Sequence, residues 1–279
     1  MPETTTFQFR DRSLTLRRGD PALMGILNVT PDSFSDGGRH DECQAAVAHA
    51  LAMLDEGTAI IDIGGESTRP GHQRVPEKEE LRRVLPVIRQ LRATTDAPIS
   101  IDTSKASVAA AALEAGADIV NDVTALADPA MPQVVAQYRA GCILMHYEQL
   151  PPDADAPAAV AAWLTRRLDE AQRLCGLPAR HFMVDPGIGF GKSVPQNLAL
   201  IAQLDALCEL PTPVLLAMSR KSFIGAVANV PDATRRLPGT IAAAVLAAPD
   251  CHLLRVHDVA ETRQALAVAH ALRKTHGKS

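Results

Sequence analysis

The sequence predicts a single-domain α/β protein, a (β/α)8 barrel preceded by a short β-hairpin. Apolar runs of strand length alternate with longer helical patterns about eight times along the 279 residues, which favours a closed parallel barrel over an open sheet. The first expected strand is followed by no G-x-G-x-x-G pattern, which weakens a dinucleotide-binding interpretation. Aromatic residues make up only 3% of the chain, so Ala, Leu, Val and Ile must form the core, as suits a barrel interior.

The expected strands are short apolar runs separated by helical patterns, several of which end at a glycine, a usual helix stop. The strands cover residues 23–29, 59–63, 98–101, 117–120, 142–145, 182–184, 213–217 and 252–256. The helices cover residues 42–56, 77–92, 105–114, 129–139, 156–175, 195–208, 239–248 and 259–273. This alternation predicts right-handed βαβ units and therefore a parallel sheet.

Residues 1–18 are expected to form an N-terminal hairpin outside the barrel proper. Residues 7–16 alternate between apolar and polar side chains around Asp11 and Arg12, which is the pattern of two short strands. We expect this hairpin to cap the bottom of the barrel. No linker or low-complexity segment divides the remainder, so residues 19–279 are expected to form one domain.

Composition and charge exclude several classes of partner. The net charge of −4 offers no basic surface for nucleic acid. No apolar run approaches the ~18 residues of a membrane span, and the polar N-terminus lacks a signal-peptide core. The five cysteines are widely spaced and form no C-x-x-C pair, which is typical of small buried side chains in a reducing cytosol. We therefore expect a cytoplasmic protein that binds neither nucleic acid nor membrane.

A polar or charged residue ends each expected strand. These residues are Asn28, Asp62, Asp102, Asn121 with Asp122, His146 after Met145, Asp185, Ser219 with Arg220 and Lys221, and Arg255 with His257. Any one of them alone is more often a helix N-cap than a ligand. Together they predict a ring at the C-terminal face, where barrel enzymes place their active sites. The mixture of carboxylates, amides and cations indicates a polar, partly anionic ligand.

Two loops add detail to this ring. Residues 28–38 are long for a strand-to-helix connection and expose one aromatic, Phe34, so they fit either a solvated loop or a lid that packs on a substrate. Residues 64–71 combine glycines with Ser67, Thr68 and Arg69, which makes a reasonable anion cradle but a weak signal alone.

These loops resemble the signatures of dihydropteroate synthases. NVTPDSFSDGG at 28–38 looks like the first signature of that family, and DIGGESTRPG at 62–71 looks like the second. The resemblance continues in order through IDT (101–103), NDV (121–123), DPGIGFGK (185–192), SRKS (219–222) and RVHDV (255–259). It implies a folate-biosynthesis transferase in which a dihydropterin carrying a CH2-diphosphate condenses with p-aminobenzoate, releasing diphosphate and forming 7,8-dihydropteroate.

The resemblance places the pterin and the diphosphate in the barrel mouth. The residues that it assigns to the pterin are Asp102, Asn121, Met145, Asp185, Phe190 and Lys221. Arg255 and His257 would hold the diphosphate, with Thr68 in contact with a phosphate. Asp102, Lys221, Arg255 and His257 would be the catalytic residues, with Asp102 stabilising the pterin cation that forms when diphosphate leaves.

The same resemblance places p-aminobenzoate among the loops. Its pocket would be formed by Phe34, Ser67, Arg69, Pro70, Arg220 and Ser222. Asn28 would be a ligand of Mg2+, which keeps mostly water and phosphate ligands and needs few from the protein. A homodimer is also implied, in which the Ala-rich last two helices could bury a surface.

One segment departs from the family pattern, and two other functions compete. After His146 the family commonly continues with Met and a glycine-containing turn, whereas this chain reads YEQLP at 147–151. His146 itself fits a buried packing residue and a site residue equally well. A corrinoid-linked methyltransferase would share Asp102, Asn121 and Asp185 but would not need the two loops. A non-catalytic paralogue predicts damaged loops, whereas those of this chain are intact.

Overall fold

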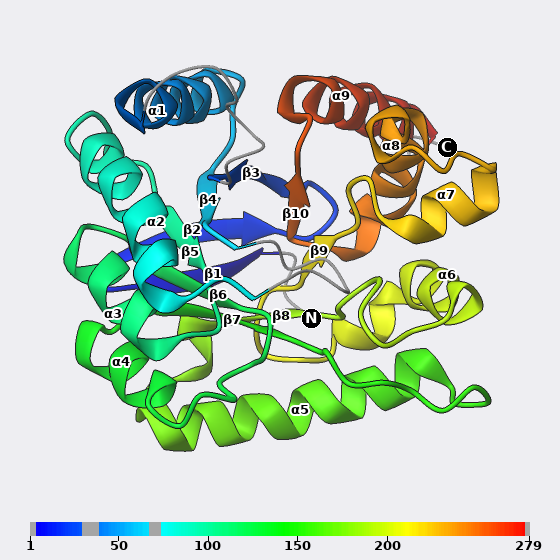
Figure 1. Cartoon of the computed structure of the whole chain (residues 1–279). Helices are drawn as coiled ribbons and strands as arrows, with labels where there is room; N and C mark the ends of the chain where they lie inside the picture. The colour runs from blue at the N-terminus through cyan, green and yellow to red at the C-terminus, as the bar shows by residue number, and fades with distance from the viewer. Residues whose placement is uncertain (1–3, 30–38, 67–73, 277–279) are drawn as a thin grey trace.

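The computed structural model describes residues 4–29, 39–66 and 74–276, and these form a ring of parallel strands surrounded by helices (Figure 1). The eight strands of the sheet follow the order β8-β7-β6-β5-β4-β3-β10-β9. A parallel bridge between Val184 and Val214, in which the Val184 N–H donates to the Pro213 carbonyl at 3.0 Å, joins the two ends. The predicted (β/α)8 barrel is therefore confirmed.

All eight predicted strands are present, and several extend further at their carboxyl ends than the apolar runs. They are β3 (Ala22–Asn28), β4 (Ile60–Gly64), β5 (Ile99–Asp102), β6 (Ile119–Asp122), β7 (Gly141–Met145), β8 (Phe182–Asp185), β9 (Leu215–Ala217) and β10 (Leu253–Val256). Hydrophobicity marks only the buried part of a strand, whereas backbone pairing continues into the polar residues. Asp102, Asn121 and Asp185 therefore belong to strands and not to loops.

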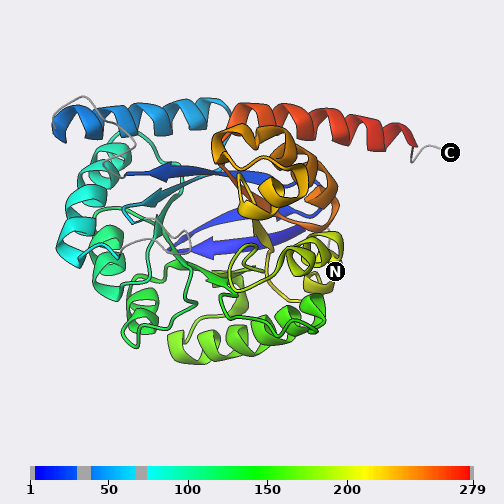
Figure 2. The same ribbon diagram turned by 45° about the vertical axis from the view of Figure 1, so that its right-hand side comes forward.

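The helices pack around the sheet and follow the predicted order, with one further helix, α7, that the apolar pattern did not predict. They are α1 (Arg39–Asp55), α2 (Glu77–Arg92), α3 (Ala106–Glu114), α4 (Met131–Tyr138), α5 (Ala156–Cys175), α6 (Val194–Ala202), α7 (Ser222–Ala228), α8 (Leu237–Ala247) and α9 (Val259–His276). Short 3-10 helices cover η2 (Ala179–His181), η3 (Leu204–Leu207), η4 (Ala233–Arg235) and η5 (Ala248–Asp250). Figure 2 shows α1 and α9 end to end along one side of the barrel, where the Arg263 side chain donates to the Glu56 carbonyl at 2.7 Å.

The helix predicted over residues 195–208 is two elements in the structure. The α-helix α6 ends before Gln203, whose φ of −124° is not helical, and η3 follows. Buried leucines lie on both sides of this break, Leu200 before it and Leu204 and Leu207 after it. The apolar spacing of a helix therefore continues across the change in backbone, which is why the pattern predicted one helix.

The predicted N-terminal hairpin is present and fills the bottom of the barrel. Strands β1 (Thr4–Phe9) and β2 (Arg12–Arg17) pair antiparallel. Phe7, Phe9 and Leu16 are fully buried against inward-facing residues from the strands of the barrel. A Cβ on Gly141 would lie 2.7 Å from Phe7, so this glycine provides the room for the ring.

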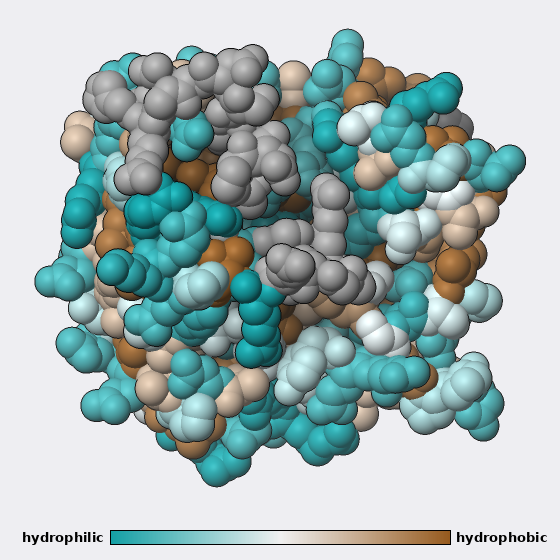
Figure 3. Space-filling view, viewed as in Figure 1, coloured by the Kyte–Doolittle hydropathy of each residue, from teal (hydrophilic) through white to brown (hydrophobic). Residues whose placement is uncertain are grey.

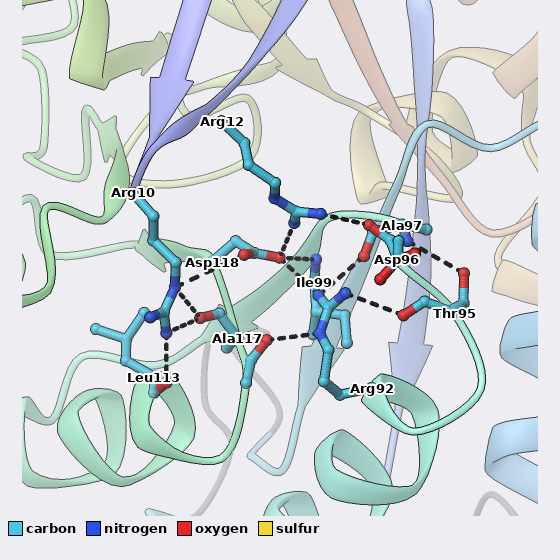
Figure 4. A network of polar contacts seen from close by, with 11 residues as sticks. Arg10, Arg12, Arg92, Thr95, Asp96, Ala97, Ile99, Leu113, Ala117 and Asp118 are labelled. Carbon is cyan, nitrogen blue, oxygen red and sulfur yellow. Dashed lines mark hydrogen bonds and ion pairs between the residues drawn. The ribbon is translucent and has the colours of Figure 1, made fainter.

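An arginine network fixes the hairpin to the barrel (Figure 4). At its centre is the buried carboxylate of Asp118, which precedes β6 and accepts from the Ile99 N–H at 3.0 Å. Arg92 of α2 lies 2.7 Å from this carboxylate, and Arg12 of the hairpin lies 2.8 Å from it. Arg12 also donates to the Asp96 carbonyl at 2.6 Å. The single carboxylate thus joins the hairpin, α2 and the sheet.

Asp118→Asn is expected to lower the free energy of unfolding by about 2 kcal/mol, because the partly exposed guanidinium groups of Arg10, Arg12 and Arg92 lose a buried counter-ion. Urea denaturation at constant pH would measure the loss. The exposed side chain of Asp96 offers the matched control, since Arg12 bonds only its backbone carbonyl, and Asp96→Asn should change stability by less than about 0.5 kcal/mol. Equal stabilities of the two variants would contradict the assignment.

No helix among the described residues has both the length and the apolar character needed to cross a membrane.

Candidate active site

The polar strand ends meet at the end of the barrel opposite the hairpin. Because all eight strands are parallel, their carboxyl ends lie at one face, as the ring of polar residues predicted. The register brings Gly64, Asp102 and Asn121 side by side on three neighbouring strands. Met145 of β7 is likewise paired with Asp185 of β8.

Arg255 of β10 reaches past β3 to two carboxylates on β4 and β5. Its Nε donates to Asp62 Oδ2 of β4 at 2.6 Å, and its Nη2 donates to Asp102 Oδ2 of β5 at 2.8 Å. Asn121 Nδ2 of β6 donates to the same Asp62 oxygen at 3.0 Å. Both carboxylates are buried, so one guanidinium balances two negative charges in a region of low solvent access.

The second oxygen of each carboxylate faces no donor from the part of the chain that the structure describes. Asp62 Oδ1 and Asp102 Oδ1 are buried and have no hydrogen-bond partner among the described residues. Burying an acceptor without a partner is unfavourable, so these atoms are suited to the N–H groups of a ligand. Burial raises the pKa of Asp102, the nearby charge of Asp62 adds to this shift, and Arg255 opposes it.

Two opposite charges also influence each other across the mouth, Asp185 at the end of β8 and Lys221 at the N-terminus of α7. Burial raises the pKa of Asp185, while the charge of Lys221 opposes that shift. Burial also lowers the pKa of Lys221 to about 8, with Asp185 again opposing. Lys221 Nζ donates to the Ile188 carbonyl and lies 4.8 Å from the centre of the Phe190 ring.

Apolar and polar walls complete the mouth. Met145 is buried and Phe190 is half-buried. The His257 ring nitrogen Nδ1 lies 3.0 Å from the hydroxyl of Ser219, and that hydroxyl also accepts from the His257 N–H at 3.3 Å. Ser219 therefore fixes the imidazole ring of His257, to which the family resemblance gives the diphosphate.

The residues predicted for the second substrate are only partly described. Phe34, Ser67, Thr68, Arg69 and Pro70 lie outside the described residues. Ser222 is exposed and begins α7. Arg220 adopts a positive φ of 58°, and its guanidinium pairs with Asp258, with Nε 3.0 Å from Oδ2. The Arg220 N–H also donates to Thr240 Oγ1 at 3.0 Å.

Asn28 ends β3 beside Gly64 and is half-buried. A Cβ on Gly64 would lie 3.8 Å from both Asn28 Oδ1 and Asp102 Oδ2, so two oxygens border the space that the missing side chain leaves. A hard amide oxygen in such a position is chemically suited to Mg2+. No cluster of three or more His, Cys, Asp or Glu side chains with metal-binding geometry occurs within residues 4–29, 39–66 and 74–276.

Three residues with central contacts were not among the predicted site residues. Asp62 was recognised only as a strand end, although a charge within the buried run of β4 was a signal that it has a partner. Ser219 was likewise taken as the end of a strand, and Lys192 as part of a motif. Their partners are distant in sequence, and local patterns do not identify such contacts.

The chain is similar to known proteins of one family. Residues 24–257 match the family described as pterin binding enzyme. The dihydropteroate synthase of Clostridium beijerinckii is 43% identical over 87% of this chain and 91% of its own length. A probable bifunctional folylpolyglutamate synthase/dihydropteroate synthase of Halobacterium salinarum is 47% identical over 90% of this chain, which spans only 31% of that longer protein.

A solved structure extends the likeness to three dimensions. The dihydropteroate synthase of Xanthomonas albilineans with 4-aminobenzoic acid superposes with a TM-score of 0.90 at 47% identity, covering 97% of this chain and 98% of that one. The match spans the barrel and the polar strand ends together. The chain therefore belongs to the pterin-binding enzyme family, and its similarity within that family is to dihydropteroate synthases.

Proposed function

We propose that the chain is a dihydropteroate synthase, a transferase that condenses 6-hydroxymethyl-7,8-dihydropterin diphosphate with p-aminobenzoate. The products are 7,8-dihydropteroate and diphosphate. The observation that carries the proposal is the network in which Arg255 joins Asp62 and Asp102, while one buried oxygen of each carboxylate has no partner among the described residues. The relatives that bear this name, and the neighbour with 4-aminobenzoic acid, support the assignment.

The donor and acceptor pattern of the mouth suits a pterin ring. The 2-amino group and ring N–H groups of a pterin are donors, which need the acceptor oxygens of Asp102 and Asp185. The ring carbonyl is an acceptor, which suits Lys221. Asn121 can both donate and accept along the same edge, while Met145 and Phe190 supply the flat apolar walls.

The charges of the site suit the departure of diphosphate. The C–O bond to the diphosphate breaks with its electron pair on oxygen, and Arg255 and His257 offer positive charge and hydrogen bonds to that group. The carboxylate of Asp102 stabilises the cation left on the pterin. The amino nitrogen of p-aminobenzoate then bonds to the CH2 carbon and loses a proton to water.

Asn28 is the residue that would hold Mg2+, with water and phosphate oxygens as the other ligands. When bound, Mg2+ supplies further positive charge to the diphosphate. The oxygens of Asn28 and Asp102 beside Gly64 support this placement. The p-aminobenzoate would lie against Ser222 and Arg220, together with Phe34, Ser67, Arg69 and Pro70, and Thr68 would contact a phosphate.

The proposed function predicts diphosphate release that requires both substrates and Mg2+. Steady-state release from the dihydropterin diphosphate should depend on p-aminobenzoate and should stop when a chelator removes Mg2+. The product 7,8-dihydropteroate should form in equal amount. Pterin binding without release at high enzyme concentration would instead favour a non-catalytic paralogue, and methyl transfer from a methylated folate would favour the methyltransferase.

A homodimer is part of the proposal and would use α8 and α9. Leu246 of α8 is 78% exposed and Val268 of α9 is 58% exposed. Figure 3 shows apolar residues on the surface over these helices. Apolar side chains exposed on two neighbouring helices favour burial against a second copy of the chain.

Leu246→Glu combined with Val268→Glu is therefore expected to convert the dimer to a monomer in sedimentation experiments. Leu174 of α5, 51% exposed, lies on the other side of the barrel (Figure 1), so Leu174→Glu is the control and should leave the dimer intact. A wild-type monomer, or a dimer in both variants, would contradict this surface.

A cytoplasmic location is likewise proposed, since all five cysteines are free and most are buried.

A further inference from the structure

The ammonium group of Lys192 lies at the junction of two loops that carry pterin-site residues. Its Nζ is 2.9 Å from His146 Nδ1 and 3.1 Å from the His146 carbonyl at the end of β7. It also donates to the carbonyls of Gly187 and Phe190 after β8, at 3.0 and 2.9 Å. An ammonium has three N–H donors, and the four acceptors around Lys192 Nζ are enough to use all of them. The proposed chemistry makes no use of this residue.

The backbones of the two loops are in direct contact at this point. Gly187 has a φ of 70°, and a Cβ on it would lie 1.9 Å from the His146 carbonyl oxygen. Gly191 has a φ of 60°, and a Cβ there would lie 2.4 Å from the Glu148 carbonyl oxygen. Such an approach brings carbonyl dipoles together. The positive charge of Lys192 compensates this crowding of oxygens, because its ammonium donates to the carbonyls of His146, Gly187 and Phe190.

His146 contributes as a neutral acceptor. Burial and the charge of Lys192 lower the pKa of His146 to about 4, so its ring is uncharged near neutral pH. With Nδ1 accepting from Lys192, the ring proton is assigned to Nε2. The ring also packs against Trp163 of α5 in an edge-on arrangement, with centroids 4.9 Å apart. These contacts support a structural function for His146 beside Lys192.

The turn that Lys192 holds touches the pterin site at three points. The Gly187 N–H donates to Asp185 Oδ1 at 2.7 Å. The Ile188 carbonyl accepts from Lys221 Nζ, and the Phe190 ring lies against the ammonium group of Lys221. Lys192 thus reaches Asp185, Phe190 and Lys221 through the turn.

We propose that Lys192 is a positioning residue for the pterin site, which holds the turn at 187–190 against the end of β7 so that Asp185, Phe190 and Lys221 are ordered before the ligand binds. This inference rests on the proposed function, because it assumes that the mouth binds a pterin. It predicts that removing the charge weakens pterin binding although Lys192 does not touch the ligand, since small displacements of binding groups are costly.

Lys192→Met is expected to weaken the binding of 6-hydroxymethylpterin by roughly 30-fold in calorimetry, in line with the cost of misplaced binding groups. KM for the dihydropterin diphosphate should rise more than kcat falls. Lys192→Gln, which keeps a donor without the charge, should give a smaller loss and provides a second variant if the first folds poorly. Unchanged affinity in a folded Lys192→Met protein would overturn the proposal.

A double-mutant cycle separates positioning from general destabilisation. If Lys192 acts through Lys221, Lys192→Met should cost much less affinity in a Lys221→Ala protein than in the wild type, whereas additive losses would count against the proposal. Asp118→Asn is the control, because it disturbs a buried ion network at the opposite end of the barrel and should leave pterin affinity unchanged.

The same measurements distinguish failure of the inference from failure of the proposed function. Pterin binding by the wild type without turnover would contradict the synthase activity and leave the Lys192 experiment valid. If the wild type turns over and both Lys192 variants bind pterin with wild-type affinity, the inference alone would be contradicted. Absence of pterin binding by the wild type would overturn both.

Discussion

Arg255→Met is expected to lower kcat/KM for diphosphate release by roughly 10²- to 10⁴-fold, because removing one member of a buried ion pair typically costs about 3–5 kcal/mol. The guanidinium is the cation that lies within hydrogen-bonding distance of both Asp62 and Asp102. Without it, two buried carboxylates repel each other, and one of them would take up a proton. The variant also loses the positive charge proposed to receive the diphosphate.

Arg167→Met provides a matched control for this prediction. The side chain of Arg167 is 18% exposed, against 14% for Arg255, and it also pairs with a carboxylate, that of Glu170 at 2.5 Å. It lies on α5 at the outside of the barrel, so its loss should change stability and leave kcat/KM within about threefold. A similar loss of activity in both variants would show that stability alone accounts for the effect.

Lys221→Ala is expected to weaken pterin binding by roughly 100-fold, in keeping with the 1.5–3 kcal/mol typical of a hydrogen bond to a charged group. The loss has two sources. The pterin carbonyl loses its donor, and Asp185 loses the charge that offsets the effect of burial on its pKa. Calorimetry with 6-hydroxymethylpterin would measure the change, and an affinity within threefold of the wild type would contradict the assignment.

The pH dependence of pterin affinity gives an independent test of Lys221. Burial lowers its pKa to about 8, so the protonated donor is present below that pH and is lost as the pH rises through it. The step near pH 8 should therefore be present in the wild type and absent in Lys221→Ala, while the loss of the Lys192 charge adds a separate step near pH 7 in both proteins. Burial lowers the pKa of Lys192 to about 7, so the control is Lys192→Met, which should lose the step near pH 7 and keep the step near pH 8.

The elements of the barrel could be predicted because each has its own local signal. The helices at Glu77–Arg92 and Ala156–Cys175 begin and end at the predicted residues, the second with Asp155 as a side-chain N-cap and Gly176 in the left-handed conformation after it. The strand ends at Asp102, Asn121 and Asp185 were placed one or two residues too early. The prediction ended each strand where its apolar residues end, whereas the backbone pairing of the strand continues into the polar residues that follow.

The sequence also indicated which side chains gather at the mouth, because parallel strands bring their carboxyl ends to one face. The resemblance added a role for each of them. Neither source identified Asp62 as the partner of Arg255 or Lys192 as the partner of His146. The sequence likewise left open whether His146 packs or binds, and the contacts to Lys192 and Trp163 favour packing.

The sequence by itself therefore determined the barrel, the face that carries the site and the kinds of groups found there. Only the tertiary structure decided which of these groups pair. Arg255 bonds to residues 193 and 153 positions away, and it reaches them past β3. Such contacts depend on the closure of the barrel and on the register between strands. Those are properties of the whole sheet, which no local pattern of hydrophobicity or turn residues specifies.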